Sequence, residues 1–505
     1  MLLGISGLLF APSLLFAGAL QLAPALLVVA GCFGGLAIVA TNAPPTGFLA
    51  QPVALSRWAG YCGATLLLML LGGETHLFHA TLDWLVRDAV LVDLVRHGPL
   101  AGYRFGESDY LLRAPLGMYM LPALVGRLFG IGAAHGALLA QNTLFLGTIF
   151  TLLAALGQGR LHIVILVLFG GVSIIGAAMR IAWTPDSAPI PFWLQWGLDS
   201  WNPRFQFSST LVQFFWVPNH ALPGWWLATL ILLQSRGQVD LATLGVSVAA
   251  ALFWSPLCIV PVALWLGVYA LRHPRAMTAP RTILGVLAGA CFLPLAIYIM
   301  LQAGSIYSGT PLLRADFLFW FCLFVVVQLP VLGLLYVARD RVRPDERWLL
   351  GVAAITLFLL LPIGFGPNND LVMRGSIVPL TIVAFIFGRI LIEETRKRSR
   401  FAIAGWILVV VSAPSAAVEV GRALATPRYA ISDCSLAEAS LELQWASVPT
   451  NYVVPTWTIP AWLIDVASIS PAHSGKERCW PDRVRARYFG LEHVLSSPPF
   501  VPYEP

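Results

Sequence analysis

Residues 111–130 read LLRAPLGMYMLPALVGRLFG, and whether this stretch crosses a membrane decides how the rest of the chain is arranged. If it crossed, every later loop would change sides. Its prolines, its two arginines (Arg113 and Arg127) and its short apolar length are typical of a helix that lies at the membrane surface or enters it partway. We therefore predict that residues 111–130 do not span the membrane.

The composition of the whole chain is that of a membrane protein. Of its 505 residues, 58% are hydrophobic and 11% are charged, whereas a soluble domain carries about 25% charged residues. The mean hydropathy is +0.78. Because the basic residues behind the net charge of +6 lie in short loops between apolar runs, we expect a lipid bilayer as partner and no nucleic acid. The first twenty residues have no basic start, so we expect a retained span there instead of a cleavable leader.

Apolar segments separated by short polar stretches predict an all-α polytopic fold. We expect about thirteen spans, the length of each being judged against the ~20 residues that cross a bilayer. They are placed at residues 2–19, 20–41, 58–76, 136–157, 162–180, 221–235, 241–255, 257–272, 283–302, 316–338, 348–363, 376–391 and 402–418.

Basic residues mark the side of the membrane on which each loop lies. The densest loops are RHPRAMTAPR (272–281), ARDRVRPDER (338–347) and EETRKRSR (393–400), with weaker ones at Arg57, Arg160 and Arg236. The positive-inside rule puts all six in the cytoplasm, with the N-terminus inside and the C-terminus outside. The expected outer segments are then 77–135, 181–220, 303–315, 364–376 and the tail. We expect residues 1–418 to form the membrane domain and 419–505 a small extracytoplasmic region, in a protein of the bacterial inner (plasma) membrane.

The cysteines divide into two groups. Cys32, Cys62, Cys258, Cys291 and Cys322 lie in apolar runs and are expected to be packing residues. Cys434 and Cys479 lie in the polar tail, without metal-ligand spacing around them. If the tail is extracytoplasmic, a disulfide between these two is a reasonable expectation.

Residues 74–98, ETHLFHATLDWLVRDAVLVDLVRHG, place many titratable side chains directly after a span. Apolar residues at spacings of three and four predict a helix here, and Asp83 and Arg87 share one of its faces. We expect an amphipathic helix lying on the membrane with its carboxylates toward water or a cavity. The simpler alternative is a solvated face that only anchors the loop.

This order of features resembles the GT-C superfamily of polytopic glycosyltransferases, which use sugars linked to polyprenyl phosphate. The resemblance covers roughly residues 58–235 and includes an acidic residue just past a span, the proline-containing RAPLGMYMLPAL, and a second outer loop rich in Trp and Asp. Members include the protein mannosyltransferases and the lipid A aminoarabinose transferases. Their usual His-Pro-Pro or Lys-Pro-Pro start appears here as Arg113-Ala-Pro115, which leaves the subfamily open.

The resemblance implies a catalytic carboxylate in the first outer loop, at Asp83 or its rival Asp88. A carboxylate can take the proton of an acceptor hydroxyl as that hydroxyl attacks C1 of the sugar. A single displacement would invert the anomeric centre.

Cationic groups at the outer surface are candidates for the phosphate of the donor, because a guanidinium fork matches phosphate oxygens. Arg374 is the first candidate, and it follows Asn369 and Asp370, which can orient a polar ligand. Snorkelling of Arg374 to the interface is an equally weighted alternative. The further candidates are Arg87, Arg113 and His220, with Arg204 and Arg314 as outer-side alternatives.

Tryptophans and carboxylates that alternate in the outer loops suit a sugar or acceptor. We expect Trp84, Asp186, Trp196 and Asp199 to take this role, although an aromatic belt at the interface explains at least half of the tryptophans in the second loop. No cofactor is certain. A divalent metal ion on Asp83, Asp186 and Asp199 with His76 or His79 stays open, because no spacing motif requires it.

Two other classes of protein compete with this interpretation. A secondary transporter would show internal pseudo-symmetry and ionisable groups at mid-bilayer, whereas the polar residues here gather on one face. A glycan polymerase or ligase that uses lipid-linked oligosaccharide would share the outer-face chemistry. The sugar, the lipid carrier, the acceptor (glycan, lipid or protein) and the oligomeric state stay open.

Overall fold

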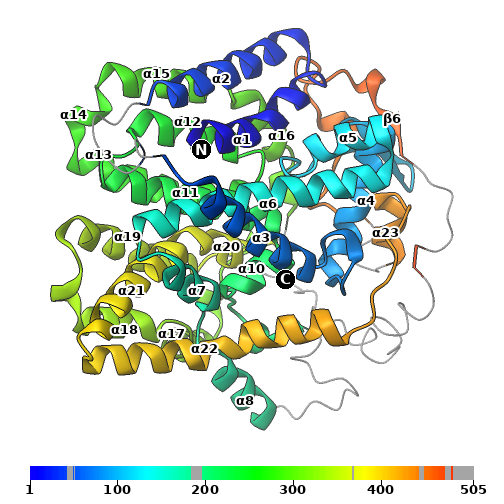
Figure 1. Cartoon of the computed structure of the whole chain (residues 1–505). Coiled ribbons are helices and arrows are strands. Elements are labelled where there is room, and N and C mark those ends of the chain that lie inside the picture. Colours follow the sequence, from blue (N-terminus) through cyan, green and yellow to red (C-terminus); the bar gives the residue numbers. More distant parts are fainter. Residues whose placement is uncertain are drawn as a thin grey trace.

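The computed structural model describes residues 1–42, 49, 52–183, 196–306, 308–366, 369–442, 448–472 and 479–480. Within these ranges the molecule is mostly helical (Figure 1), and each of the thirteen segments predicted to span coincides with a helix or with two helices in succession. Five described helices are long and apolar enough to cross a membrane, or seven if each of two bent helix pairs counts as one span. The structure therefore supports the polytopic helical class. By length and composition, fewer described helices qualify as spans than the thirteen that were predicted.

The N-terminal half alternates long helices with short polar segments. Its elements are α1 (Leu2–Ala17), α2 (Leu22–Ala40), α3 (Leu55–Leu71), η2 (Glu74–His76), α4 (Leu82–His97), β1 (Ala101–Phe105), β2 (Ser108–Leu112), α5 (Met120–Phe129), α6 (Ile131–Leu156), α7 (Arg160–Leu168), α8 (Ser173–Trp183), η3 (Leu198–Trp201), α10 (Thr210–Trp216), α11 (Pro218–Ser235) and α12 (Leu241–Ala251).

The C-terminal half contains more broken helices. Its elements are η4 (Pro256–Cys258), α13 (Ile259–Arg272), α14 (Pro274–Met277), α15 (Pro280–Ala290), α16 (Leu293–Met300), η5 (Ala303–Ser305), β3 (Ser308–Gly309), η6 (Pro311–Leu313), α17 (Phe317–Gln328), α18 (Pro330–Val337), η7 (Arg339–Arg341), α19 (Pro344–Leu360), β4 (Gly364–Phe365), α20 (Asp370–Gly375), α21 (Ile377–Arg396), α22 (Arg400–Ala425), α23 (Leu436–Glu442), β5 (Val453–Pro455), η8 (Thr456–Thr458), η9 (Val466–Ser468) and β6 (Ser470–Pro471).

Proline explains the sharpest of the breaks. Helices α17 and α18 meet at 61°, and Pro330 is the first residue of α18. A proline cannot continue the hydrogen-bond ladder of the preceding helix, but its fixed φ suits the first turn of a new one.

The stretch 111–130 does not form one continuous helix. Residues 111–112 end strand β2, a turn follows, and α5 begins at Met120. With ten residues, α5 is about 15 Å long, or half the thickness of the hydrocarbon core. It packs against α4 and α6, which agrees with the prediction that this stretch does not span.

The six basic segments gather at one end of the molecule, which we name the basic end. Arg236 pairs with Glu346 at 3.1 Å, and Arg341 pairs with Glu394 at 3.5 Å. Further contacts link Arg281 to Asp240 and the carbonyl of Ile38, Gln158 to Glu393, and both Arg57 and Arg160 electrostatically to Tyr61. The prediction that these loops share one side is confirmed, and the cytoplasmic assignment of that side stays a prediction.

The opposite end, which we name the tail end, is built from the first predicted outer loop and the C-terminal region. In Figure 1 it lies on the right with α4, α23 and β6, while α14 lies on the left. A four-stranded sheet in the order β5-β2-β1-β6 joins the two parts. Strand β2 pairs antiparallel with β1 and with β5, and β1 pairs parallel with β6. The C-terminal region is thus integrated with the loop, and the boundary expected at 418 falls inside α22.

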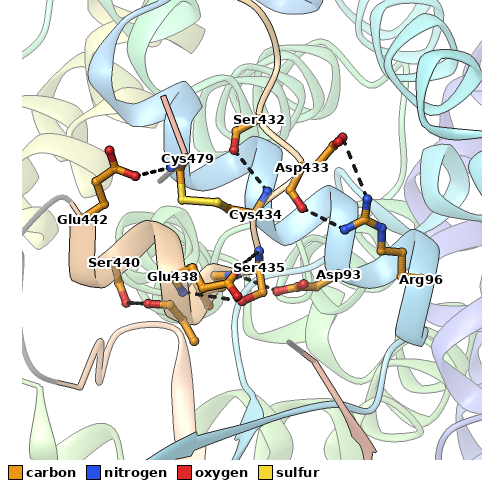
Figure 2. The surroundings of a disulfide bond; sticks show 12 residues. Asp93, Arg96, Ser432, Asp433, Cys434, Ser435, Glu438, Ser440, Glu442 and Cys479 are labelled. Atoms are coloured by element: carbon orange, nitrogen blue, oxygen red, sulfur yellow. Dashed lines mark hydrogen bonds and ion pairs between the residues drawn. A yellow bond between two sulfur atoms is a disulfide. The ribbon is translucent and has the colours of Figure 1, made fainter. Parts of the chain in front are cut away.

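A disulfide between Cys434 and Cys479 closes this region (Figure 2), as the sequence led us to expect. Beside it, Asp93 of α4 accepts hydrogen bonds from the Tyr103 hydroxyl and from the Leu436 amide, each at 2.8 Å. Burial raises the pKa of Asp93 to about 7, although both hydrogen bonds work against that rise. Arg96 donates to the Asp433 carbonyl, so one face of α4 holds the C-terminal segment.

Helix α4 itself departs from the prediction. The helix was expected and is present, but residues 84–94 are buried on every face. Helices α5, α6 and α23 and strand β1 all contact it. It is therefore an internal helix and does not lie with an open polar face at the surface. The cause is the packing of these elements, the tail helix α23 among them, which local periodicity does not predict.

Candidate active site

Two ion pairs from distant segments meet at the tail end. In α4, Arg87 Nη2 donates to Asp83 Oδ2 at 3.0 Å, and in α20 Arg374 pairs with Asp370 at the same spacing of four residues. The side chain of Asp83 is 29% exposed, and those of Arg374 and Asp370 are 16% and 18% exposed. Arg374 also interacts electrostatically with Asp83. The two candidates named first from the sequence, Asp83 and Arg374, are thus brought together.

Contacts made by Trp84 and Arg87 hold the start of α4 in place. The Trp84 indole donates to the Gly72 carbonyl at 2.8 Å and lies under the Arg87 guanidinium. Arg87 also donates to the Trp216 carbonyl, while its buried Nη1 has no hydrogen-bond partner among the described residues. Trp84 is 1% exposed. Trp84 was predicted to bind sugar, but its ring is buried inside the protein. It instead holds Arg87 and the start of α4 in place.

Two tyrosines that the sequence analysis did not select border the ion pairs. Tyr119 precedes α5 and interacts electrostatically with Arg87 and Asp83, and Tyr452 interacts with Arg87, Asp83, Arg374 and Asp370. Burial raises the pKa of Tyr452 to about 12 and raises that of Tyr119 further. Both phenols are therefore neutral hydrogen-bond donors near pH 7.

His220, a predicted donor-binding residue, interacts electrostatically with this group, and its ring already has a hydrogen-bond partner. Its Nδ1 is 2.7 Å from the Ser255 hydroxyl, and the ring interacts electrostatically with Arg374 and Arg87. The Cys258 thiol donates to the carbonyls of both His220 and Arg374. This thiol therefore fastens α11 to α20 and holds the two candidate residues near each other.

Asn369 has a structural task at the same place. Its φ of 56° puts it in the left-handed region, which asparagine tolerates better than most residues, and its side-chain oxygen accepts from the Phe365 amide at 3.4 Å. It shapes the turn that starts α20, whereas Asp370 is the member of this pair that reaches the site.

Beneath Asp83 lies a buried polar cluster formed by Glu74, His76, Asp88, His135 and Asn142. His76 Nε2 is 2.6 Å from Asp88, and His135 approaches the same carboxylate at 4.0 Å. Asp88 is 2% exposed. The expectation that Asp88 could serve as the exposed catalytic base is therefore corrected, because its carboxylate is enclosed and paired with His76.

Two members of the cluster have shifted titration. Burial raises the pKa of Glu74 to about 8, although the hydrogen bond from Asn142 (2.7 Å) and the charge of Arg87 oppose that rise. Burial lowers the pKa of His76, but Asp88 and the hydrogen bond to the Tyr429 carbonyl outweigh burial, so that the net shift is upward. At neutral pH Glu74 is therefore protonated, and the Asp88 carboxylate favours the charged form of His76.

The turn that delivers Glu74 and His76 is strained. Gly73, Thr75 and His76 have φ values of 96°, 66° and 56°. A positive φ is a genuine outlier for a β-branched residue such as threonine. At Gly73 a Cβ atom would also lie 2.5 Å from the Cα of Ala80, so glycine is required. Strain of this kind gathers at functional sites.

A third ion pair, Glu419 with Arg422 at 3.2 Å, adjoins the site through Trp216. The Trp216 indole donates to Glu419 at 2.9 Å, and its carbonyl accepts from Arg87. Gly197 packs on this pair so closely that a Cβ would lie 2.9 Å from the Glu419 carboxylate. The sequence analysis missed Glu419 and Arg422 because it ended the last span at 418. An Arg three residues after a Glu at a helix end was the available signal.

The remaining predicted residues have structural roles or lie elsewhere. Arg113 is 4% exposed and donates to the Thr450 carbonyl, so it joins the loop to the tail and is enclosed where an exposed phosphate-binding residue was expected. Asp199 is 1% exposed and accepts from Ser173, Ser209 and Ser415, which corrects its expected sugar-binding role. Trp196 is half-buried next to Gly197. Asp186 lies outside the described residues.

Metal binding is not favoured by the described part of the chain, in which no group of three or more His, Cys, Asp or Glu side chains is arranged to hold an ion. His79, the predicted ligand, instead places Nδ1 3.1 Å from the Pro427 carbonyl. Comparisons with protein-family models, curated proteins and solved structures found no match to this chain. The candidate site therefore rests on its own geometry: two half-exposed carboxylates, two guanidiniums and two neutral phenols from four separate segments.

Proposed function

We propose that this protein is an integral membrane glycosyltransferase that moves a sugar from a polyprenyl-phosphate carrier to an acceptor hydroxyl. The observation that carries the proposal is the meeting of Asp83 and Arg374 in one half-exposed polar site. A transfer from a phosphate needs a base on one side of the sugar and a cation on the other. This site offers both.

In the proposed reaction, the acceptor oxygen forms a bond to C1 of the sugar while the bond from C1 to the phosphate oxygen breaks. The proton of the acceptor hydroxyl goes to the Asp83 carboxylate, which Arg87 holds in place at 3.0 Å. The phosphate leaves with the bonding electrons and its charge is stabilised by Arg374. A single displacement of this kind inverts the configuration at C1.

The location of the site supports an extracytoplasmic reaction. The site belongs to the tail end, and the six basic segments lie at the other end. If the basic end faces the cytoplasm, as the positive-inside rule demands, Asp83 faces the periplasm or exterior. The disulfide of the tail agrees with that compartment.

The test is a transfer assay on the full-length protein in liposomes with labelled polyprenyl-phospho-sugars. We expect Asp83→Asn to lower the transfer rate by about 10²–10⁴-fold, the usual contribution of a general base. Asp109→Asn is the matched control, because Asp109 is an exposed carboxylate in strand β2 of the same loop. Equal rates for the two variants would remove Asp83 as the base.

The buried cluster around Glu74 and Asp88 favours the transporter as second candidate, because enclosed ionisable groups are typical of proton-coupled transport. The two candidates separate in the same liposomes, since a transporter would move a solute in response to a pH gradient without any covalent transfer. The polymerase or ligase alternative shares the proposed chemistry and differs only in the donor, a lipid-linked oligosaccharide.

A further inference from the structure

The C-terminal region places one residue, Tyr452, against the candidate site. Tyr452 directly precedes β5, whose residues 453–455 pair with 110–112 of β2. The Arg113 amide donates to the Tyr452 carbonyl at 2.6 Å, and the Arg113 guanidinium donates to the Thr450 carbonyl at 2.8 Å. Strand pairing on one side and Arg113 on the other therefore fix the backbone at residue 452.

Both ion pairs act electrostatically on the Tyr452 side chain. It interacts electrostatically with Asp83 and Arg87 of α4 and with Asp370 and Arg374 of α20. It is half-buried, and its hydroxyl has no hydrogen-bond partner among the residues that the structure describes. The phenol O–H is therefore available to donate a hydrogen bond to a ligand or to water.

The following inference rests on the proposed function. We propose that the Tyr452 hydroxyl forms a hydrogen bond, as the donor, to the phosphate of the sugar-carrying lipid, next to Arg374. The C-terminal region then supplies part of the donor site.

The charges around Tyr452 explain why a neutral donor suits this position. Asp83 and Asp370 repel an anion, and Arg374 is already paired with Asp370. A further cation here would pair with Asp83 and weaken it as a base, because an opposite charge stabilises the ionised carboxylate. A phenol adds a hydrogen bond to the phosphate and leaves the charge of the carboxylates unchanged.

The experiment measures binding of undecaprenyl phosphate to the full-length protein in nanodiscs that also contain phosphatidylglycerol, so that general attraction to anionic lipid is constant. We expect Tyr452→Phe to raise the Kd about tenfold, the effect of losing one hydrogen bond to a charged group. Tyr110→Phe is the matched control, a half-buried tyrosine on β2 opposite Pro455. Equal thermal unfolding of both variants excludes a folding defect.

Three outcomes decide the matter. A tenfold loss in Tyr452→Phe alone, with a raised KM for donor and an unchanged KM for acceptor, supports the inference. If Arg374→Gln weakens binding while Tyr452→Phe behaves as Tyr110→Phe, the role of Tyr452 is refuted and the proposed function stands. If the wild type does not bind undecaprenyl phosphate, both fall.

Discussion

The basic end and the tail end use the same kinds of charged side chain in opposite ways. At the basic end, Arg389 pairs with Glu346 and Glu393, and Arg236 pairs with Glu346 and donates to the Leu156 carbonyl. Arg389 and Glu346 are 2% and 1% exposed, and no buried polar atom of these four side chains lacks a partner. We call this network closed, because each of its buried polar atoms has a partner.

At the tail end the networks are open. Arg87 has a buried nitrogen without a hydrogen-bond partner among the described residues, and the same holds for one oxygen of Glu74 and for Nε2 of His135. Asp83, Asp370 and Arg374 are partly exposed. Because buried polar groups are nearly always satisfied, the contrast indicates that charge at the basic end maintains the fold, while charge at the tail end is available for interactions with water or a ligand.

The largest expected effect breaks the closed network. Glu346→Gln leaves Arg389 and Arg236 without their shared carboxylate, and we expect a loss of about 3–5 kcal/mol in the free energy of unfolding. Asp83→Asn, in the partly exposed pair, should cost only about 1 kcal/mol. Denaturant unfolding in detergent measures both. Equal losses of unfolding free energy in the two variants would show that the ion pairs of the two ends stabilise the fold to the same extent.

The next effect concerns the covalent closure of the tail end. The disulfide links residues 45 apart in sequence, and the chain-entropy treatment gives about 4 kcal/mol for such a loop, with measured values nearer 2–4 kcal/mol. Replacing both Cys434 and Cys479 by Ser should therefore expose the tail to proteolysis. Cys322→Ser, at an exposed free thiol, is the control, and tail cleavage at the same rate in both would contradict the expectation.

The titration of Glu74 should make the stability of the protein depend on pH, which tests the open network at the tail end. The pKa of Glu74 is raised by burial from 4.5 to about 8, so between these values the folded protein holds a proton that the unfolded chain has released. Stability then falls as pH rises through this window, by up to about 1.4 kcal/mol per pH unit. In Glu74→Gln this contribution is absent.

The measurement is the apparent Tm of Glu74→Gln and wild type from pH 5 to pH 8. Asp93, whose pKa is also raised by burial, to about 7, titrates in both proteins. The difference between the two curves therefore isolates Glu74. We expect the variant to gain stability relative to the wild type as pH rises, and parallel curves would show that Glu74 is ionised throughout.

The smallest effect tests the basic end again. Asp240 caps α12 by accepting from the Thr243 amide at 2.7 Å and pairs with Arg281. We expect Asp240→Ala to cost about 1 kcal/mol in unfolding free energy, the usual value of a helix cap. Asp240→Asn keeps the cap and removes the charge, so it should cost less. If Asn costs as much as Ala, the ion pair matters more than the cap.

Much of the fold was predictable because it depends on local hydropathy. Each apolar run became helical, since a chain segment in an apolar environment must satisfy its own backbone hydrogen bonds. The grouping of basic loops followed from alternation of spans once residues 111–130 were held back from crossing. The cysteine pairing followed from there being only two cysteines in the polar tail.

The site was predictable only in part. Asp83 and Arg374, the two candidates named first, interact electrostatically in the structure, whereas Trp84, Asp88, Arg113 and Asp199 are enclosed. A sequence pattern states which residues share a helix face, but not what covers that face. His76 and His135, from η2 and α6, enclose Asp88, and Asp83 at the start of the same helix stays partly exposed.

The sequence by itself determined the polytopic helical class and the separation of the polar site residues from the basic loops. It could do so because the free energy of moving apolar side chains out of water depends on the local composition of each segment. Only the tertiary structure decided that Tyr452, Glu419 and the Glu74 cluster join Asp83. Hydrogen bonds and ion pairs between residues hundreds of positions apart depend on how the helices pack. Local hydropathy and periodicity therefore do not predict them.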